Sequence, residues 1–255
     1  MLEPKQKSAS LNHSLVQMPV RHDKDSAEAL LSLSMALISL AEDILEQHVQ
    51  TDEQLSRDSA LMPGGTLGKH FRHIIESFHA FLFPLYLNPV QPPYVPEINY
   101  DNNKYQSRRL VARELKTCRK AMREISRDLQ AWGNSCRRQG IVSCHEKDMN
   151  PAALGKEDSG DVCDGLSNEM RRKVNVVAIT PTKQIAGSTV GRELWYVSLH
   201  AIHHFSMLRT IAVYELGLDL PIEFGTAPAT LLQRGISWKP PVSREEVKIV
   251  RTSKL

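Results

Sequence analysis

Four segments of the chain carry apolar residues at the spacing of an amphipathic helix, and this pattern most limits the folds open to it. The segments cover residues 26–48, 67–83, 103–132 and a stretch from residue 189 to about 216. Each would present one apolar stripe that must be buried against another element. Long helices of this kind satisfy that need by packing side by side, so we predict an all-α fold, a four-helix bundle.

Residues that start and stop helices mark the ends of two segments. Thr66 is expected to cap the second helix, and either Ser188 or Thr189 the fourth, because their hydroxyls can accept from free backbone N–H groups. Gly217 suits the position just after the last helix. The proline-rich residues 84–96 predict an extended loop after the second helix.

The remaining segments lack a helical pattern. Residues 1–24 are expected to be a disordered tail and residues 236–255 a C-terminal tail, on either side of a helical domain spanning 25–235. Within that domain, residues 133–170 are rich in Gly, Ser and Asp and predict a largely disordered insertion. The valines of residues 173–179 predict a short strand before the last helix.

Composition limits the classes of partner. The 255 residues are 41% hydrophobic with a net charge of +3, so the chain can bury a sizeable core but offers no basic surface for nucleic acid. We expect no membrane partner, because the longest apolar stretch, residues 29–41, is too short to span a bilayer. No secretory leader opens the chain and its four cysteines form no Cys-x-x-Cys pair, which predicts a cytoplasmic protein with reduced thiols.

Histidines are concentrated in two of the predicted helices. His200 and His204 are four residues apart and therefore lie on one helix face, whereas His203 is rotated by about 60° from His200. A second pair, His70 and His73, lies in the second helix. Either residue of that pair could add a third imidazole to His200 and His204, and the local pattern does not separate them.

Three neutral imidazoles can bind a divalent ion such as zinc, nickel or iron and leave a coordination position open for water or substrate. An ion bound in this way lowers the pKa of a coordinated water or thiol and so generates a nucleophile near neutral pH. Glu76 and Glu193 are candidates to orient the ligands, although solvated helix charges are the simpler interpretation of both.

Two motifs resemble a known family. Gly65-Thr-Leu-Gly-Lys-His-Phe-Arg-His73 and His200-Ala-Ile-His-His204 are similar to the DinB-like (DinB/YfiT) superfamily of metal-dependent four-helix-bundle proteins. The resemblance covers residues 25–132 and 174–232. It implies that His73, His200 and His204 hold a divalent metal ion, and in some members it implies thiol-dependent transferase or isomerase chemistry.

The predicted function is therefore a metal-dependent transferase or hydrolase. Its metal, held by His73, His200 and His204, would activate water or a thiol for chemistry on a small molecule, with a homodimer as a possible assembly. The alternative is a non-catalytic module that binds a metal or another protein. No catalytic residue beyond the metal ligands can be named from the sequence.

Overall fold

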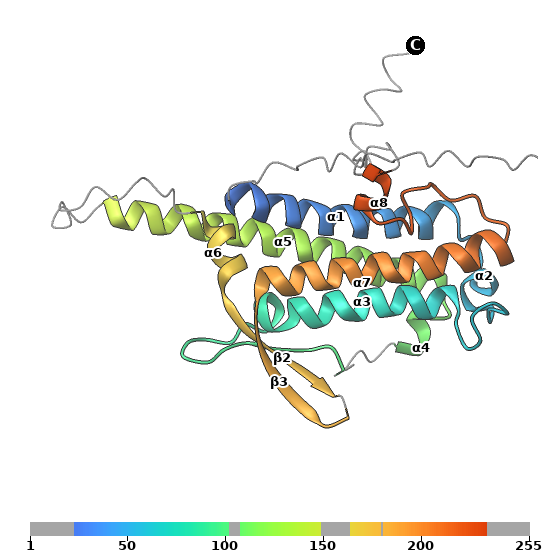
Figure 1. The fold of residues 1–255 in the computed structure, drawn as a ribbon, viewed down its shortest axis with the longest axis horizontal. Coiled ribbons are helices and arrows are strands. Elements are labelled where there is room, and N and C mark those ends of the chain that lie inside the picture. The colour runs from blue at the N-terminus through green and yellow to red at the C-terminus, as the bar shows by residue number, and fades with distance from the viewer. Residues whose placement is uncertain (1–22, 102–107, 149–163, 180, 234–255) are drawn as a thin grey trace, which may run out of the picture.

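Four long helices lie side by side and form the body of the protein (Figure 1). The computed structural model describes residues 23–101, 108–148, 164–179 and 181–233. The long helices within these ranges are α1 (Asp23–Gln47), α3 (Leu67–Leu82), α5 (Leu115–Asp148) and α7 (Val190–Thr210). Both α1 and α3 pack against α5 and α7, so each helix buries its apolar stripe against two others.

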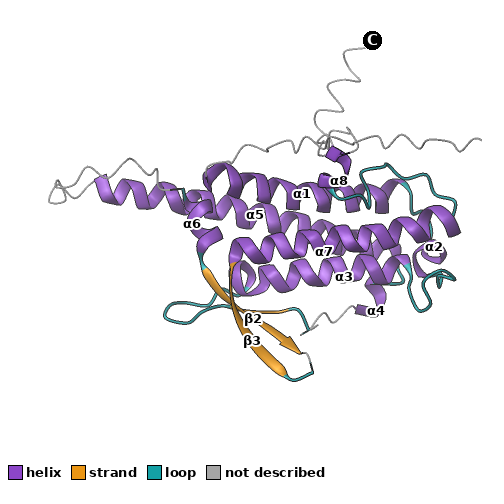
Figure 2. Cartoon of the chain, viewed as in Figure 1, coloured by secondary structure: helices purple, strands orange, loops and turns teal. Residues whose placement is uncertain are grey.

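Shorter elements complete the described chain (Figure 2). They are the helices α2 (Asp52–Ser56), α4 (Arg108–Val111), α6 (Gly165–Arg171) and α8 (Pro228–Gln233), the π-helical turns Phe83–Leu87 and Ile211–Glu215, and the strands β1 (Glu97–Asn99), β2 (Lys173–Ile179) and β3 (Lys183–Thr189). Strand β2 pairs in parallel with β1 and antiparallel with β3, with Val176 opposite Ile98 and Ala186. The protein is thus mostly helical with a small three-stranded sheet.

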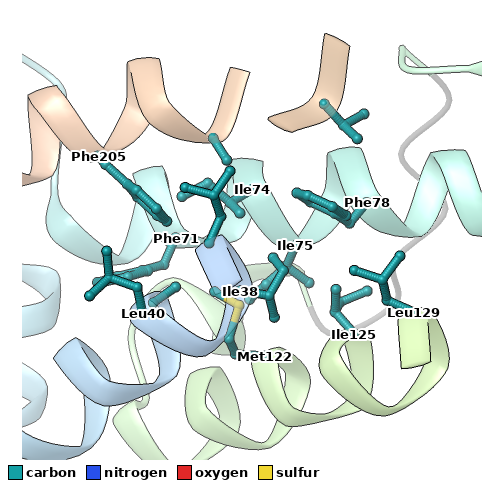
Figure 3. Close-up of a cluster of buried hydrophobic side chains, with 14 of the residues drawn as sticks. Ile38, Leu40, Phe71, Ile74, Ile75, Phe78, Met122, Ile125, Leu129 and Phe205 are labelled. Atoms are coloured by element: carbon teal, nitrogen blue, oxygen red, sulfur yellow. The ribbon is translucent and has the colours of Figure 1, made fainter. Parts of the chain in front are cut away.

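The core lies between the four long helices (Figure 3). Aromatic and branched side chains from all four meet there with almost no exposed surface. Among them are Ile38 and Leu40 of α1, Phe71, Ile74, Ile75 and Phe78 of α3, Met122, Ile125 and Leu129 of α5, and Phe205 of α7. Burying this apolar surface is the main stabilising contribution to the helix packing.

Several predicted element boundaries are confirmed. The Thr66 hydroxyl accepts from the backbone N–H of Lys69 at 3.0 Å, and the Thr189 hydroxyl accepts from Arg192 at 3.3 Å, so both threonines cap helices. Gly217 has a φ of 64°, the left-handed conformation expected just after a helix. Strand β2 occupies the residues predicted for it.

The predicted third helix, 103–132, is wrong in its continuity and in its C-terminal end, while residues 103–107 lie outside the described residues. The chain turns after α4, α5 begins only at Leu115, and it then continues to Asp148. A disordered insertion over 133–170 is therefore wrong for the parts that form α5 and α6, while 149–163 lies outside the described residues. The buried stripe of α5 continues through Trp132 and Cys136, which explains why the helix does not stop there.

Other differences concern the sheet and the tails. The predicted extended loop at 84–96 begins as the π-helical turn, which directly continues α3 and contains Pro84. Because proline has no N–H to continue the α-helical hydrogen bonds, the regular α-helix ends before it. Strands β1 and β3 were not expected from the sequence. The predicted tails fall mostly outside the described residues. No described helix is long and apolar enough to cross a membrane.

Gly68 allows an unusually close approach between two backbones. A Cβ atom at this position would lie 2.1 Å from the carbonyl oxygen of Ala112, in the turn between α4 and α5. No side chain can occupy that space, because the obstacle is backbone rather than a movable side chain. The first turn of α3 is thereby held against the segment that leads into α5.

Candidate functional site

The pairing of α3 with α7 gathers five histidines. The first turns of α3 face the last turns of α7, so the two helices run in opposite directions (Figure 1). This arrangement brings His70 and His73 of α3 next to His200, His203 and His204 of α7. The predicted ligands His73, His200 and His204 are therefore close together, although they are far apart in sequence.

His204 is the centre of this histidine cluster. Its Nδ1 lies 3.0 Å from Nδ1 of His70, and its Nε2 lies 3.1 Å from Nε2 of His200. The residue is only 7% exposed, whereas His70 and His200 are half-buried. His204 thus contacts a neighbour through each ring nitrogen.

His73 and His203 approach His204 differently. The rings of His73 and His204 are stacked, with centroids 5.3 Å apart and an interplanar angle of 16°. Nδ1 of His73 also lies 4.0 Å from a carboxylate oxygen of Glu76. His203 is exposed, and its ring is 5.6 Å from that of His204. His203 therefore borders the cluster from the solvent side.

The environment keeps the central imidazoles neutral. Burial, followed by the charges of the neighbouring histidines, lowers the pKa of His204 to about 3. Burial, followed by the charge of His73, lowers the pKa of His70 to about 4. The pKa of His200 is also lowered, mainly by burial. Neutral rings at pH 7 retain the lone pairs that a metal ion requires.

These shifts predict that the metal-free protein loses stability in acid. The unfolded chain takes up protons on these histidines near pH 6.5, whereas folded His70 and His204 stay neutral down to about pH 4 and 3. Because the unfolded state binds more protons in this window, the free energy of unfolding should decrease as the pH falls. The slope is at most about 1.4 kcal/mol per pH unit for each histidine, reduced by solvent screening.

Urea unfolding of the metal-free protein between pH 7.5 and pH 4 measures this slope. A His204→Gln variant, which cannot be protonated at this position, should show a shallower dependence than the unmodified chain. Equal slopes for both proteins would contradict the prediction.

The chemistry of the cluster suits a metal ion. Nε2 of His70 is buried without a hydrogen-bond partner, and the surrounding donors are neutral imidazoles. Within the described ranges, however, no three His, Cys, Asp or Glu side chains are already arranged around a common point. The reason is that His70 contacts Nδ1 of His204 whereas His200 contacts Nε2, on the other side of the ring. Three imidazoles could share an ion only after a ring has turned.

Both glutamates considered as ligand-orienting residues are buried, so the interpretation as solvated charges is wrong. Glu76 is 6% exposed and lies 3.6 Å from Arg72 as well as near His73. Glu193 is 1% exposed and accepts a hydrogen bond from the Tyr100 hydroxyl at 2.9 Å. The sequence signal for Glu193 was its position seven residues before His200, which places both on one face of α7.

The buried cysteines and the described cavity lie elsewhere. Burial raises the pKa values of Cys118 and Cys136 to about 12, so neither thiol is a ready nucleophile. A cavity of about 460 Å³ lies between the turn after α3, α5 and α6, with Trp132 and Arg172 among its lining residues. None of the five clustered histidines lines it.

Comparison with known proteins leaves the family open. No family model matches the chain, and no solved structure matches it. A stretch of 44 residues is 54% identical to part of FK506-binding protein 5 from Rhizopus delemar. The match spans 17% of this chain and 11% of that protein, which is too little to show a shared family.

Proposed function

We propose that the histidine cluster is the divalent-metal site of a DinB-like four-helix bundle, with His73, His200 and His204 as ligands. The observation that carries this proposal is the convergence of histidines from two helices on His204. Imidazoles held at such short distances in a partly buried setting are costly unless they are neutral and paired. A cation bound by several of these imidazoles would stabilise the arrangement.

The proposed reaction is transfer or hydrolysis of a small molecule by a metal-activated water or thiol. A bound zinc, nickel or iron ion would supply Lewis acidity and lower the pKa of that nucleophile. The protein would contribute neutral ligands, since burial already keeps His200 and His204 unprotonated. The thiol would come from the substrate, because burial makes Cys118 and Cys136 poor nucleophiles.

The proposal extends to the setting of the protein. We propose a cytoplasmic location, a small-molecule or thiol substrate, and no nucleic-acid partner. The modest net charge of +3 supports the last point. A homodimer is compatible with the exposed Trp195 and Leu199, which lie one turn apart on α7.

Metal analysis of the purified full-length protein tests the proposal. Protein produced under metal-replete conditions should carry stoichiometric divalent metal, and His73→Ala and His200→Ala should lose it. His203→Ala is the matched control, because His203 is exposed at the border of the cluster. Absence of metal from the unmodified protein would sink the proposal.

The same experiment decides between the two histidines of α3. Loss of metal in His70→Ala with retention in His73→Ala would replace His73 by His70 in the ligand set. Catalysis is tested separately by adding thiols and small electrophiles to the cobalt-substituted protein. If they leave its absorption spectrum unchanged, the site belongs to a non-catalytic metal-binding module.

A further inference from the structure

Glu193 is a fully buried carboxylate whose hydrogen-bonding needs are met by three side chains. One of its oxygens accepts from the Ser188 hydroxyl at 2.6 Å and from Arg192 Nη1 at 2.9 Å, and the other accepts from the Tyr100 hydroxyl at 2.9 Å. Burying a charge is strongly unfavourable unless it is paired in this manner. The arrangement therefore fixes the position of each donor.

Tyr100 and Ser188 both reach Glu193 from the small sheet. Tyr100 directly follows β1, and Ser188 is near the end of β3. Because β2 pairs with both strands, the sheet holds these two residues in a set relation to the start of α7. Burial and the adjacent Glu193 carboxylate raise the pKa of Tyr100 well above its ordinary value, so its hydroxyl remains a donor.

A row of rings leads from Tyr100 to the histidine cluster. The rings of Tyr100 and Tyr196 are 5.1 Å apart, and Tyr196 stacks on His200 with centroids 5.9 Å apart and an interplanar angle of 17°. Tyr196 and His200 are one helical turn apart on α7, so they share a face. His200 then meets His204 through its Nε2 atom.

We propose that Tyr100 is a positioning residue for His200: its hydrogen bond to buried Glu193 fixes its ring, and that ring holds Tyr196 against the His200 imidazole. The importance of this role for metal binding rests on the proposed function. The positioning itself does not depend on a metal. The small sheet would then serve to place Tyr100 against α7.

The test uses the full-length chain with Tyr100→Phe, which removes only the hydroxyl, and Glu193→Gln, which keeps the shape of the acceptor but removes its charge. Tyr94→Phe is the matched control, because Tyr94 is 75% exposed. The first readout is the set of ring resonances of His200 in metal-free protein, assigned with His200→Gln. The second is the affinity for Co²⁺ together with its absorption spectrum.

Tyr100→Phe should shift the His200 resonances more than Tyr94→Phe does, and it should weaken Co²⁺ binding by up to about tenfold. Glu193→Gln should shift the same resonances. Unchanged His200 resonances in a folded Tyr100→Phe protein would overturn the positioning role. Failure of the unmodified protein to bind Co²⁺ would count against the proposed function instead, while the metal-free resonances still decide the role of Tyr100.

Discussion

Replacing His204 with alanine is expected to reduce affinity for divalent metal at least about a hundredfold, the largest loss for any single histidine. His204 is the only member of the cluster in ring contact with each of the other four described histidines of the cluster. Its removal takes away one ligand and also the ring against which His70, His73 and His200 are placed. Isothermal titration with Zn²⁺ measures the loss.

His79→Ala is the matched control for this substitution. His79 also lies on α3, but its ring contacts Phe83 rather than the cluster. The control should bind Zn²⁺ like the unmodified protein. Equal Zn²⁺ affinities for the His204→Ala and His79→Ala proteins would show that His204 is not part of the metal site.

Substituting Gly68 with alanine should destabilise the fold by more than about 3 kcal/mol. On helix propensity alone the change would stabilise α3 by roughly 1 kcal/mol. The added Cβ atom would instead lie 2.1 Å from the Ala112 carbonyl oxygen, so α3 must move away from the start of α5. Chemical denaturation followed by circular dichroism measures the change in unfolding free energy.

Gly187→Ala provides the comparison, because a Cβ atom at Gly187 would have no neighbour within 4 Å. Its unfolding free energy should stay within about 1 kcal/mol of the unmodified value. A Gly68→Ala protein as stable as this control would show that the two backbones can separate without cost.

The helical part of the fold is readable from the sequence where apolar spacing and capping residues agree. Thr66 and Thr189 each precede an apolar stripe, and both helices begin where expected. The third helix was predicted to end at residue 132 because the residues that follow, 133–170, are rich in Gly, Ser and Asp. In the structure Gly133 is instead a point of close packing, where a Cβ atom would lie 2.5 Å from Leu31.

The two outer strands of the sheet were not predicted, because neither shows an alternation of apolar and polar residues long enough to be typical of a strand. Strand β3 is mostly exposed and carries no alternation of apolar and polar residues, so only its pairing with β2 defines it. Strand β1 is three residues long and pairs with a partner far along the chain. Long-range pairing of this kind leaves no local trace in the sequence.

The sequence predicted that His200 and His204 share a helix face, but it did not predict how the histidines of α3 and α7 lie relative to one another. Helical spacing placed His200 and His204 on one face, and they do meet there. The relative importance of His70 and His73 could not be predicted, because it depends on how α3 is rotated against α7. The structure places His70 at hydrogen-bonding distance from His204 and His73 in a stack with it.

The row of imidazoles from His70 through His204 to His200 also has a preferred direction for its ring hydrogens. Neutral His204 carries a single N–H, so it donates to one neighbour and accepts from the other. If His70 accepted at Nδ1, its own hydrogen would sit on Nε2, buried without an acceptor. A buried orphan N–H is the costlier defect, so the hydrogens run from His70 to His204 and on to His200.

In this order Nε2 of His204 carries the ring hydrogen. An electrophile that binds to this nitrogen therefore requires the opposite order, with the hydrogen of His204 on Nδ1. In the reversed order the ring hydrogen of His70 is on Nε2. This atom is next to Gly65, where an added Cβ atom would lie 3.3 Å from it. A change of tautomer on the His200 side of the cluster would thereby alter which atom of His70 carries the hydrogen next to the loop that precedes α3.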